Sequence, residues 1–191
     1  MNPYTSRAKD FLFWQPPLDY LALLLSKKFG RQLFVFLNFF IWPYLFYLSV
    51  ILTITDPNIF WQIFIAMFIS VFVEYLLKSL LPWKRPITKT QNFLPFGIHH
   101  QWALKGSFPS GHTAKTLIFF LFILQYGVHS PLIFILINVP LVLARIFLGF
   151  HYPVDIFGGL LTGFISWLFT HQLIFPSEFT DPLRDIFKLV F

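Results

Sequence analysis

Residues 59–77 read IFWQIFIAMFISVFVEYLL, and their only charged residue is Glu74. A run of about 20 apolar residues is long enough to cross the hydrocarbon core of a bilayer as an α-helix. The whole chain is similarly apolar, because 57% of its 191 residues are hydrophobic and only 12% are charged. A soluble domain carries about 25% charged residues, so the sequence indicates a membrane protein.

Four further apolar runs accompany this segment, at residues 33–54, 113–128, 132–150 and 154–175. Residues 11–31 mix aromatic and basic side chains, which favours an interfacial helix around 18–29. We therefore expect an all-α fold, a polytopic membrane helical bundle of about five transmembrane helices plus an N-terminal interfacial helix. We expect a single domain over residues 1–191 with its core at about 18–175, followed by an amphipathic or frayed tail.

The absence of cysteine and the excess of positive charge restrict the chemistry. With no Cys, the chain has no disulfide framework, thiolate zinc site or cysteine nucleophile. The 14 Lys and Arg residues outnumber the 8 Asp and Glu residues, which gives a formal net charge of +6. This balance favours anionic partners, such as the lipid bilayer and a membrane lipid phosphate substrate, and no nucleic acid is expected.

Charged residues near the ends of membrane spans are candidate functional residues, because each charge within the membrane costs roughly 2.5–3.5 kcal/mol on insertion scales. Three clusters of this kind follow one another along the chain. They are Lys78 with Arg85, then Ser110, Gly111 and His112, then Arg145, His151 and Asp155. Five spans would place all three at one membrane face, beside residues 78–112, the longest polar stretch and a candidate catalytic loop.

The cations of these three clusters are suited to binding a phosphate group. Lys78, Arg85 and Arg145 offer three positive charges to phosphate oxygens, and an Arg fork can bind two oxygens at once. Ser110 and Gly111 begin a predicted helix, whose first backbone N–H groups can hold the same phosphate. Together these groups predict phosphoryl transfer.

The clusters also contain two histidines, His112 and His151. Asp155 lies one helical turn from His151 and can fix the tautomer of its imidazole. One nitrogen of His151 is then able to attack phosphorus, while His112 protonates the departing oxygen. This division of roles requires the two imidazoles to be in opposite protonation states.

The motifs Lys78-x6-Arg85-Pro86, Pro109-Ser110-Gly111-His112 and Arg145-x5-His151-x3-Asp155 occur in this order. In these residues the chain resembles the type 2 phosphatidic acid phosphatase (PAP2) superfamily, in its membrane lipid phosphatase branch. The resemblance implies that His151 forms a phosphohistidine, with Asp155 as its partner and His112 as general acid. It also implies metal-independent hydrolysis with no cofactor, and phosphate-binding roles for Lys78, Arg85, Ser110, Gly111 and Arg145.

Two features depart from the family pattern. Ala144 stands where many members have Ser before the third-motif Arg, which removes one hydroxyl but no charge. Six-helix members carry an additional span before the interfacial helix, and residues 1–31 are too short and polar to supply it.

The resemblance offers several substrates, which the sequence does not separate: lipid A 1-phosphate, phosphatidylglycerophosphate, undecaprenyl diphosphate and phosphatidic acid. A lipid-to-lipid phosphotransferase is an alternative, and so is a non-catalytic lipid-binding or transport protein on the same scaffold. Retention of both His151 and Asp155 favours an enzyme.

Structural roles can be assigned to several other polar and aromatic residues. Glu74 is expected to pair with Lys78, four residues later, or to bond to another helix, rather than to relay protons. His129 and His171, at the far ends of spans, are expected to be structural. His99 and His100 are expected to belong to a solvated loop or a substrate-facing lid rather than to a metal site. Trp83 and Trp102 fit either a gate for lipid or an interfacial aromatic belt. Gly159 and Gly163 suit close helix packing.

Two observations give opposite predictions for the membrane face at which the site lies. Ten basic residues lie on its predicted face and two in the short segments of the other, which by the positive-inside rule favours the cytoplasm. The ten are Arg7, Lys9, Lys27, Lys28, Arg31, Lys78, Lys84, Arg85, Lys89 and Lys105, against Arg184 and Lys188. The family resemblance implies a multi-pass protein of the bacterial inner membrane with its site at the periplasmic face, and we expect that placement.

Overall fold

The computed structural model describes residues 9–89 and 106–190, and within them it contains helices and no strand. This confirms the predicted all-α class. In chain order the helices are α2 (Leu18–Ser26), α3 (Lys28–Phe39), α4 (Ile41–Thr55), α5 (Pro57–Leu80), the short 3₁₀ helix η1 (Pro86–Lys89), α7 (Gly111–Tyr126), α8 (Pro131–Phe147), α9 (Pro153–Thr170) and α10 (Ser177–Val190).

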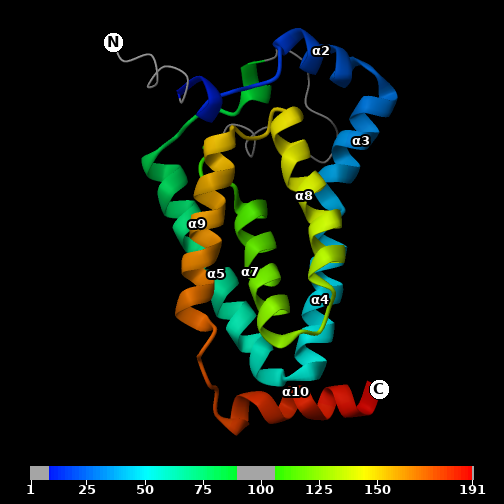
Figure 1. Ribbon diagram of the computed structural model, residues 1–191, viewed down its shortest axis with the longest axis vertical. Helices are drawn as coiled ribbons and strands as arrows, with labels where there is room; N and C mark the ends of the chain where they lie inside the picture. The colour runs from blue at the N-terminus through cyan, green and yellow to red at the C-terminus, as the bar shows by residue number, and fades with distance from the viewer. Residues whose placement is uncertain (1–8, 90–105, 191) are drawn as a thin grey trace.

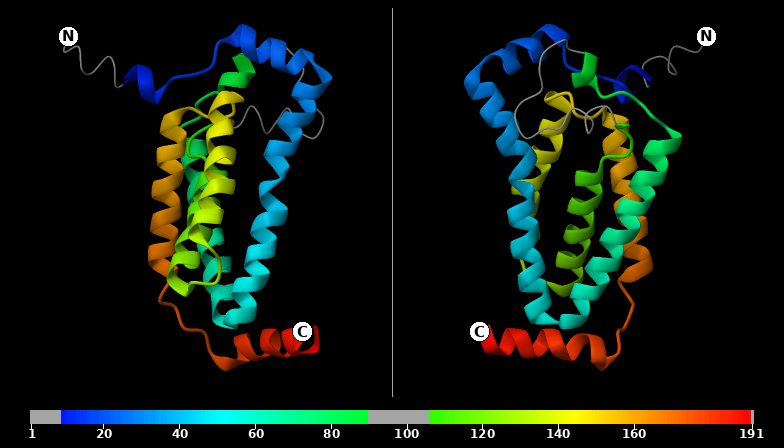
Figure 2. Two further views of the ribbon diagram at one scale, coloured as in Figure 1. Left: turned by 45° about the vertical axis from the view of Figure 1, so that its right-hand side comes forward. Right: turned by 180° about the vertical axis from the view of Figure 1, so that it is seen from behind.

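The long helices form a bundle around α7. Helices α3 and α4 follow each other along one side, and α5, α7, α8 and α9 run in the same general direction beside them (Figure 1). Helix α7 contacts α4, α5, α8 and α9. Helix α2 lies across one end of the bundle and α10 across the other, as the views in Figure 2 agree. Side chains at the start of α7 are therefore surrounded by other helices.

Three helical segments of the described residues are long and apolar enough to cross a membrane: Lys28–Thr55, Pro57–Leu80 and Pro153–Thr170. Helix α8 is also apolar but shorter. The outward side chains suit contact with lipid, since Phe46, Phe68 and Phe169 are 71%, 66% and 69% exposed. The structure thus supports a membrane helical bundle and gives three candidate spans, where the sequence predicted about five.

Several predicted boundaries were wrong by a few residues. The interfacial helix ends at Ser26 rather than near residue 29, because Lys27 is extended and a new helix begins at Lys28. Helix α5 continues to Leu80 and α7 begins at Gly111, so the predicted loop 78–112 contains two helix ends. The expected tail is a helix, α10, attached to α5 by a hydrogen bond of 2.9 Å from Trp61 Nε1 to the Phe179 carbonyl. Predictions for Arg7, His99, His100, Trp102 and Lys105 lie outside the described residues.

Two glycines of α9 allow the backbones of α7 and α9 to touch. A Cβ at Gly159 would lie 2.5 Å from the Ser110 carbonyl oxygen, and one at Gly163 would lie 2.4 Å from the Ala114 carbonyl oxygen. Both distances are far below van der Waals contact with atoms that cannot rotate away. The prediction that these glycines serve packing is confirmed, and this packing sets the start of α7 against the start of α9.

A substitution at this contact should destabilise the bundle. In Gly163→Ala the added methyl must push the two helices apart, and overpacking of this kind costs about 1–3 kcal/mol. We expect a lower midpoint of thermal unfolding in detergent micelles. The matched control is Leu161→Ala on the same helix, whose side chain is 61% exposed. Equal midpoints for Gly163→Ala and the unmodified chain would contradict the proposed close packing.

Candidate active site

The structure brings the predicted site residues to one end of the bundle, the end that α2 crosses (Figure 1). Lys78 lies in the last turn of α5 and Arg145 in the last turn of α8. Arg85 lies between α5 and η1. The remaining five residues occupy the first turns of two helices or their approach: Ser110, Gly111 and His112 at α7, and His151 and Asp155 at α9.

A chain of polar contacts runs from Asp155 through His151 to Arg85. Asp155 Oδ2 is 3.3 Å from His151 Nδ1, and His151 Nε2 is 3.3 Å from Arg85 Nη1. All three side chains are buried, with Asp155 at 0% exposure. A carboxylate and a guanidinium have fixed roles as acceptor and donor, so Nδ1 carries the proton and Nε2 has the lone pair. The arrangement thus presents an unprotonated ring nitrogen next to a cation.

The start of α9 holds this contact in place. Asp155 is the third residue of the helix, and its Oδ2 also accepts a hydrogen bond of 2.8 Å from the Tyr152 N–H. Pro153 at the first helical position needs no such partner, because it has no N–H. The same carboxylate therefore caps the helix and orients the imidazole.

The segment before His151 is tied to three other elements. The backbone N–H groups of Phe150 and His151 both donate to the Arg145 carbonyl, at 2.9 and 3.2 Å. Arg85 Nη1 donates to the Phe150 carbonyl at 3.0 Å. Gly149 has φ +69°, and a Cβ there would lie 2.7 Å from Leu21 Cδ1 of α2. The tight turn therefore requires glycine, and it links α2 to the candidate nucleophile.

Burial and neighbouring charge control the protonation of Arg85 and His151, which both lie outside the helices. Burial lowers the pKa of Arg85 to about 10, although the carboxylates of Asp155 and Glu74 oppose the shift, and the group stays positive at neutral pH. Burial also holds the pKa of His151 well below its usual value, and the positive charges of Arg85, Arg145 and Lys78 add to the effect. His151 is therefore neutral at pH 7, the form that a nucleophile needs.

The start of α7 faces the same site. The Ser110 N–H donates to the Asp155 carbonyl at 2.9 Å, which joins the two helix starts directly. Thr113 Oγ1 donates to Ser110 Oγ at 2.9 Å, and the Ser110 side chain is fully buried. His112 is partly exposed and lies edge-to-face with Trp42 of α4, with ring centroids 5.2 Å apart. The two histidines thus reach the site from different helices.

Sequence reasoning missed one cation, Lys115. Its Nζ lies 3.2 Å from Glu74 Oε2 and 3.2 Å from the Gly111 carbonyl oxygen. The predicted pairing of Glu74 with Lys78 is confirmed, since Lys78 Nζ donates to Glu74 Oε1. Glu74 thus joins two lysines from different helices. The signal in the sequence was a lysine within an apolar run, three residues after His112 and so on the same helical face.

Other predicted residues have structural contacts. Trp83 packs against Phe13 and Phe108, with ring centroids 5.4 and 5.2 Å apart. His171 stacks on Trp167 at 4.2 Å at the end of α9 farthest from the site. His129 lies in the turn between α7 and α8, where its Nδ1 is 3.0 Å from the Ser130 carbonyl oxygen. These contacts agree with the structural roles expected of the two histidines.

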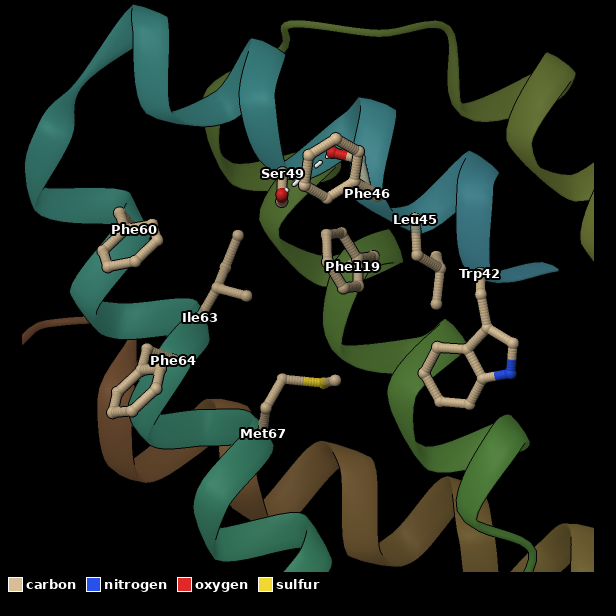
Figure 3. A pocket seen from close by; sticks show the side chains of 9 residues that line it. All are labelled: Trp42, Leu45, Phe46, Ser49, Phe60, Ile63, Phe64, Met67 and Phe119. Carbon is tan, nitrogen blue, oxygen red and sulfur yellow. Dashed lines mark hydrogen bonds between the residues drawn. The ribbon is translucent and has the colours of Figure 1, made fainter. Parts of the chain in front are cut away.

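An apolar cavity of about 290 Å³ lies between α4, α5 and α7 (Figure 3). Trp42 lines it and also contacts His112, so the cavity adjoins the candidate site. The other lining residues are Leu45, Phe46, Ser49, Phe60, Ile63, Phe64, Met67 and Phe119. A second apolar cavity, of about 350 Å³, lies between α7, α8 and α9.

Comparison with known proteins identifies the class to which this fold and site belong. The profile of the PAP2 superfamily matches residues 58–178, more than half of the chain and a range that contains all eight predicted site residues. The chain therefore belongs to the PAP2 superfamily, which confirms the family resemblance of its three motifs.

A curated relative from Escherichia coli (strain K12), named "Putative undecaprenyl-diphosphatase YbjG", is 36% identical over 119 residues. The matched region is 61% of this chain and 57% of that protein, so the similarity spans little more than half of the relative. No solved structure matches the chain.

The depressed pKa of His151 predicts a dependence of stability on pH. Because the unfolded imidazole titrates near 6.5, the unfolded state gains a proton first as pH falls. This group leaves the free energy of unfolding unchanged above pH 6.5. Below that pH it lowers the free energy by up to about 1.4 kcal/mol per pH unit, until the folded imidazole also titrates.

The measurement is unfolding in detergent micelles from pH 7.5 to 5, for the unmodified chain and for His151→Gln. We expect His151→Gln to flatten the decline below pH 6.5. The matched control, His171→Gln, removes an imidazole at the opposite end of the bundle. An unchanged slope in His151→Gln would show that this imidazole is not held neutral.

Proposed function

We propose that the chain is an integral-membrane lipid phosphatase in which His151 Nε2 is the nucleophile. One observation carries the proposal: the buried His151 imidazole is held between Asp155 and Arg85, so that Nδ1 is protonated and Nε2 has a lone pair. A histidine with only a structural role would not need a carboxylate on one nitrogen and a phosphate-binding cation beside the other.

In the proposed reaction, Nε2 bonds to phosphorus and the bond from phosphorus to the leaving oxygen breaks. His112 gives its proton to that oxygen, and a phosphohistidine remains. Water then attacks the phosphohistidine, and His112 accepts a proton from the water, which restores both histidines and releases phosphate. Lys78, Arg85 and Arg145, with the backbone N–H groups that follow Ser110, stabilise the charge on the transferred phosphoryl group. In this scheme the cations take the role that a metal ion has in other phosphatases.

The substrate is proposed to be a membrane lipid phosphate. The apolar cavity beside Trp42 supports this, because it can bind a hydrocarbon chain while the head group lies at His151. Similarity to a protein named for undecaprenyl diphosphate favours a polyprenyl lipid among the candidates. Lipid A 1-phosphate, phosphatidylglycerophosphate and phosphatidic acid are to be compared with it.

We further propose one domain over the whole chain, with five spans formed by α3 with α4, α5, α7, α8 and α9. Helices α7 and α8 have 16 and 17 residues, so they cross a bilayer only where it is thin or where polar residues at their ends extend the span. The proposed location is the bacterial inner membrane, with the site at the periplasmic face.

The orientation has a direct test, because the chain has no native Cys. Lys89 and Ser177 are exposed and lie at opposite ends of the bundle. We expect Lys89→Cys to react with an impermeant thiol reagent from the periplasmic side, and Ser177→Cys only after the membrane is opened. Labelling of position 89 only from the cytoplasmic side would reverse the orientation.

The activity itself is tested by phosphate release from the four candidate lipids in detergent. We expect activity that survives EDTA, is inhibited by orthovanadate, and falls by at least about 10³-fold in His151→Ala. Activity that His151→Ala retains, or that EDTA abolishes, would contradict the mechanism. A phosphotransferase would release little free phosphate until its acceptor lipid was omitted.

The role of the apolar cavity predicts a dependence on chain length. Met67→Trp narrows the cavity between α4, α5 and α7, so KM for a long-chain lipid should rise about tenfold, as expected when one or two methylene groups lose their burial. A water-soluble analogue with the same head group should be unaffected. The matched control is Val139→Trp in the cavity between α7, α8 and α9. Equal effects of the two substitutions on this KM would contradict the proposal that the hydrocarbon chain of the lipid binds in the first cavity.

A further inference from the structure

Two members of one largely buried charge cluster, Glu74 and Lys115, have no role in the mechanism described so far. Glu74 of α5 accepts hydrogen bonds from Lys78 of the same helix and from Lys115 of α7. The Lys115 side chain is 10% exposed and that of Glu74 is 20% exposed. A cation one turn inside an apolar helix is costly, so a site that keeps Lys115 must use it either for packing or for chemistry.

Lys115 lies on the side of the site where the leaving group would be. It is three residues after His112, so both project from one face of α7. Both also contact the same indole: Lys115 Nζ is 5.9 Å from the centroid of the Trp42 ring, and the His112 ring is 5.2 Å from it. The proposed nucleophile, His151, by contrast, comes from the segment just before α9. Lys115 is therefore associated with the group that His112 protonates and not with the nitrogen that attacks.

A second phosphate is the leaving group that such a cation would suit. When a monophosphate ester is cleaved, the departing oxygen belongs to an alcohol and needs a proton. When a diphosphate is cleaved, the departing oxygen belongs to another phosphate, which stays negatively charged even after His112 has protonated it. A lysine beside the leaving oxygen therefore aids the second reaction more than the first.

We propose that Lys115 binds the phosphate that leaves with the lipid, so that the site prefers lipid diphosphates to lipid monophosphates. The inference rests on the function proposed above and adds the substrate class. In the step concerned, His151 Nε2 bonds to the terminal phosphorus while the bond from that phosphorus to the bridging oxygen breaks. The electron pair moves to the bridging oxygen, which takes the proton of His112, and the lipid monophosphate leaves as an anion paired with Lys115. Water later hydrolyses the phosphohistidine.

Glu74 is the positioning residue for this cation. Its two oxygens hold the ammonium groups of Lys78 and Lys115, whose charges would otherwise repel each other. The Glu74 carboxylate packs directly against Gly111, because a Cβ at Gly111 would lie only 2.0 Å from Glu74 Oε2. Among the described residues, Glu74 and the Gly111 carbonyl use two of the three donors of Lys115, which leaves a third for phosphate.

The test compares one lipid chain carrying either a monophosphate or a diphosphate, for example farnesyl phosphate and farnesyl diphosphate. We expect Lys115→Met to lower kcat/KM for the diphosphate by about 10- to 100-fold, as for loss of a hydrogen bond to a charged group. The value for the monophosphate should change by less than about threefold. Lys115→Arg should keep the preference, and Lys28→Met, at an exposed lysine of α3, should leave both values unchanged.

Glu74 is tested by Glu74→Gln, which keeps the size of the side chain and removes its charge. We expect a smaller loss of preference than in Lys115→Met, and no further loss when the two substitutions are combined, because both act through Lys115. Additive losses in the double variant would overturn the positioning role.

The outcomes separate this inference from the proposed function. If the unmodified chain releases phosphate from neither lipid, the proposed function fails. If it acts on both and Lys115→Met lowers both rates equally, Lys115 is structural and the inference is overturned while the function stands. Should Lys115→Met not fold, inhibition of the unmodified chain decides: inorganic diphosphate should inhibit at least about tenfold more tightly than phosphate, and equal inhibition would overturn the inference.

Discussion

The site depends on one backbone hydrogen bond, from the Ser110 N–H to the Asp155 carbonyl oxygen at 2.9 Å. This bond joins the first turn of α7 to the first turn of α9, and it forms only because Gly159 and Gly163 allow the two backbones to touch. His112 lies in the first turn of α7 and His151 just before α9. The contact therefore fixes the two backbone segments that carry the histidines relative to each other, as the proposed two-histidine mechanism requires.

Buried and partly buried charges of both signs lie near this backbone contact. The cations are Lys78, Arg85, Lys115 and Arg145, and the carboxylates are Glu74 and Asp155. Each carboxylate contacts a side chain that has a role in the proposed chemistry. The four cations outnumber the two carboxylates. The result is a net positive pocket in an apolar bundle, where the low dielectric strengthens attraction to a phosphate. An excess of cations is costly to fold and favourable for binding an anion.

Sequence alone predicted the helical class, the three motifs and the pairing of Glu74 with Lys78. These features depend on spacing along one helix or on composition, which the sequence displays directly. The contact between Lys115 and Glu74 could not be predicted in this way, because it joins residues 41 positions apart on different helices. The break at Lys27 and the end of α8 at Phe147 were also missed, since an apolar run shows that a helix forms but not where neighbouring elements end it.

The division of labour between α7 and α9 also bears on the geometry of phosphoryl transfer. Displacement at phosphorus requires the attacking and leaving atoms to lie on roughly opposite sides. Here His151 lies just before α9, while His112 and Lys115 come from α7 and both lie near Trp42. Because Trp42 also lines the apolar cavity, a lipid chain bound there as proposed would have its head group near His112. The bond to be broken would then lie between the two helices, with the nucleophile on one side and the departing oxygen on the other.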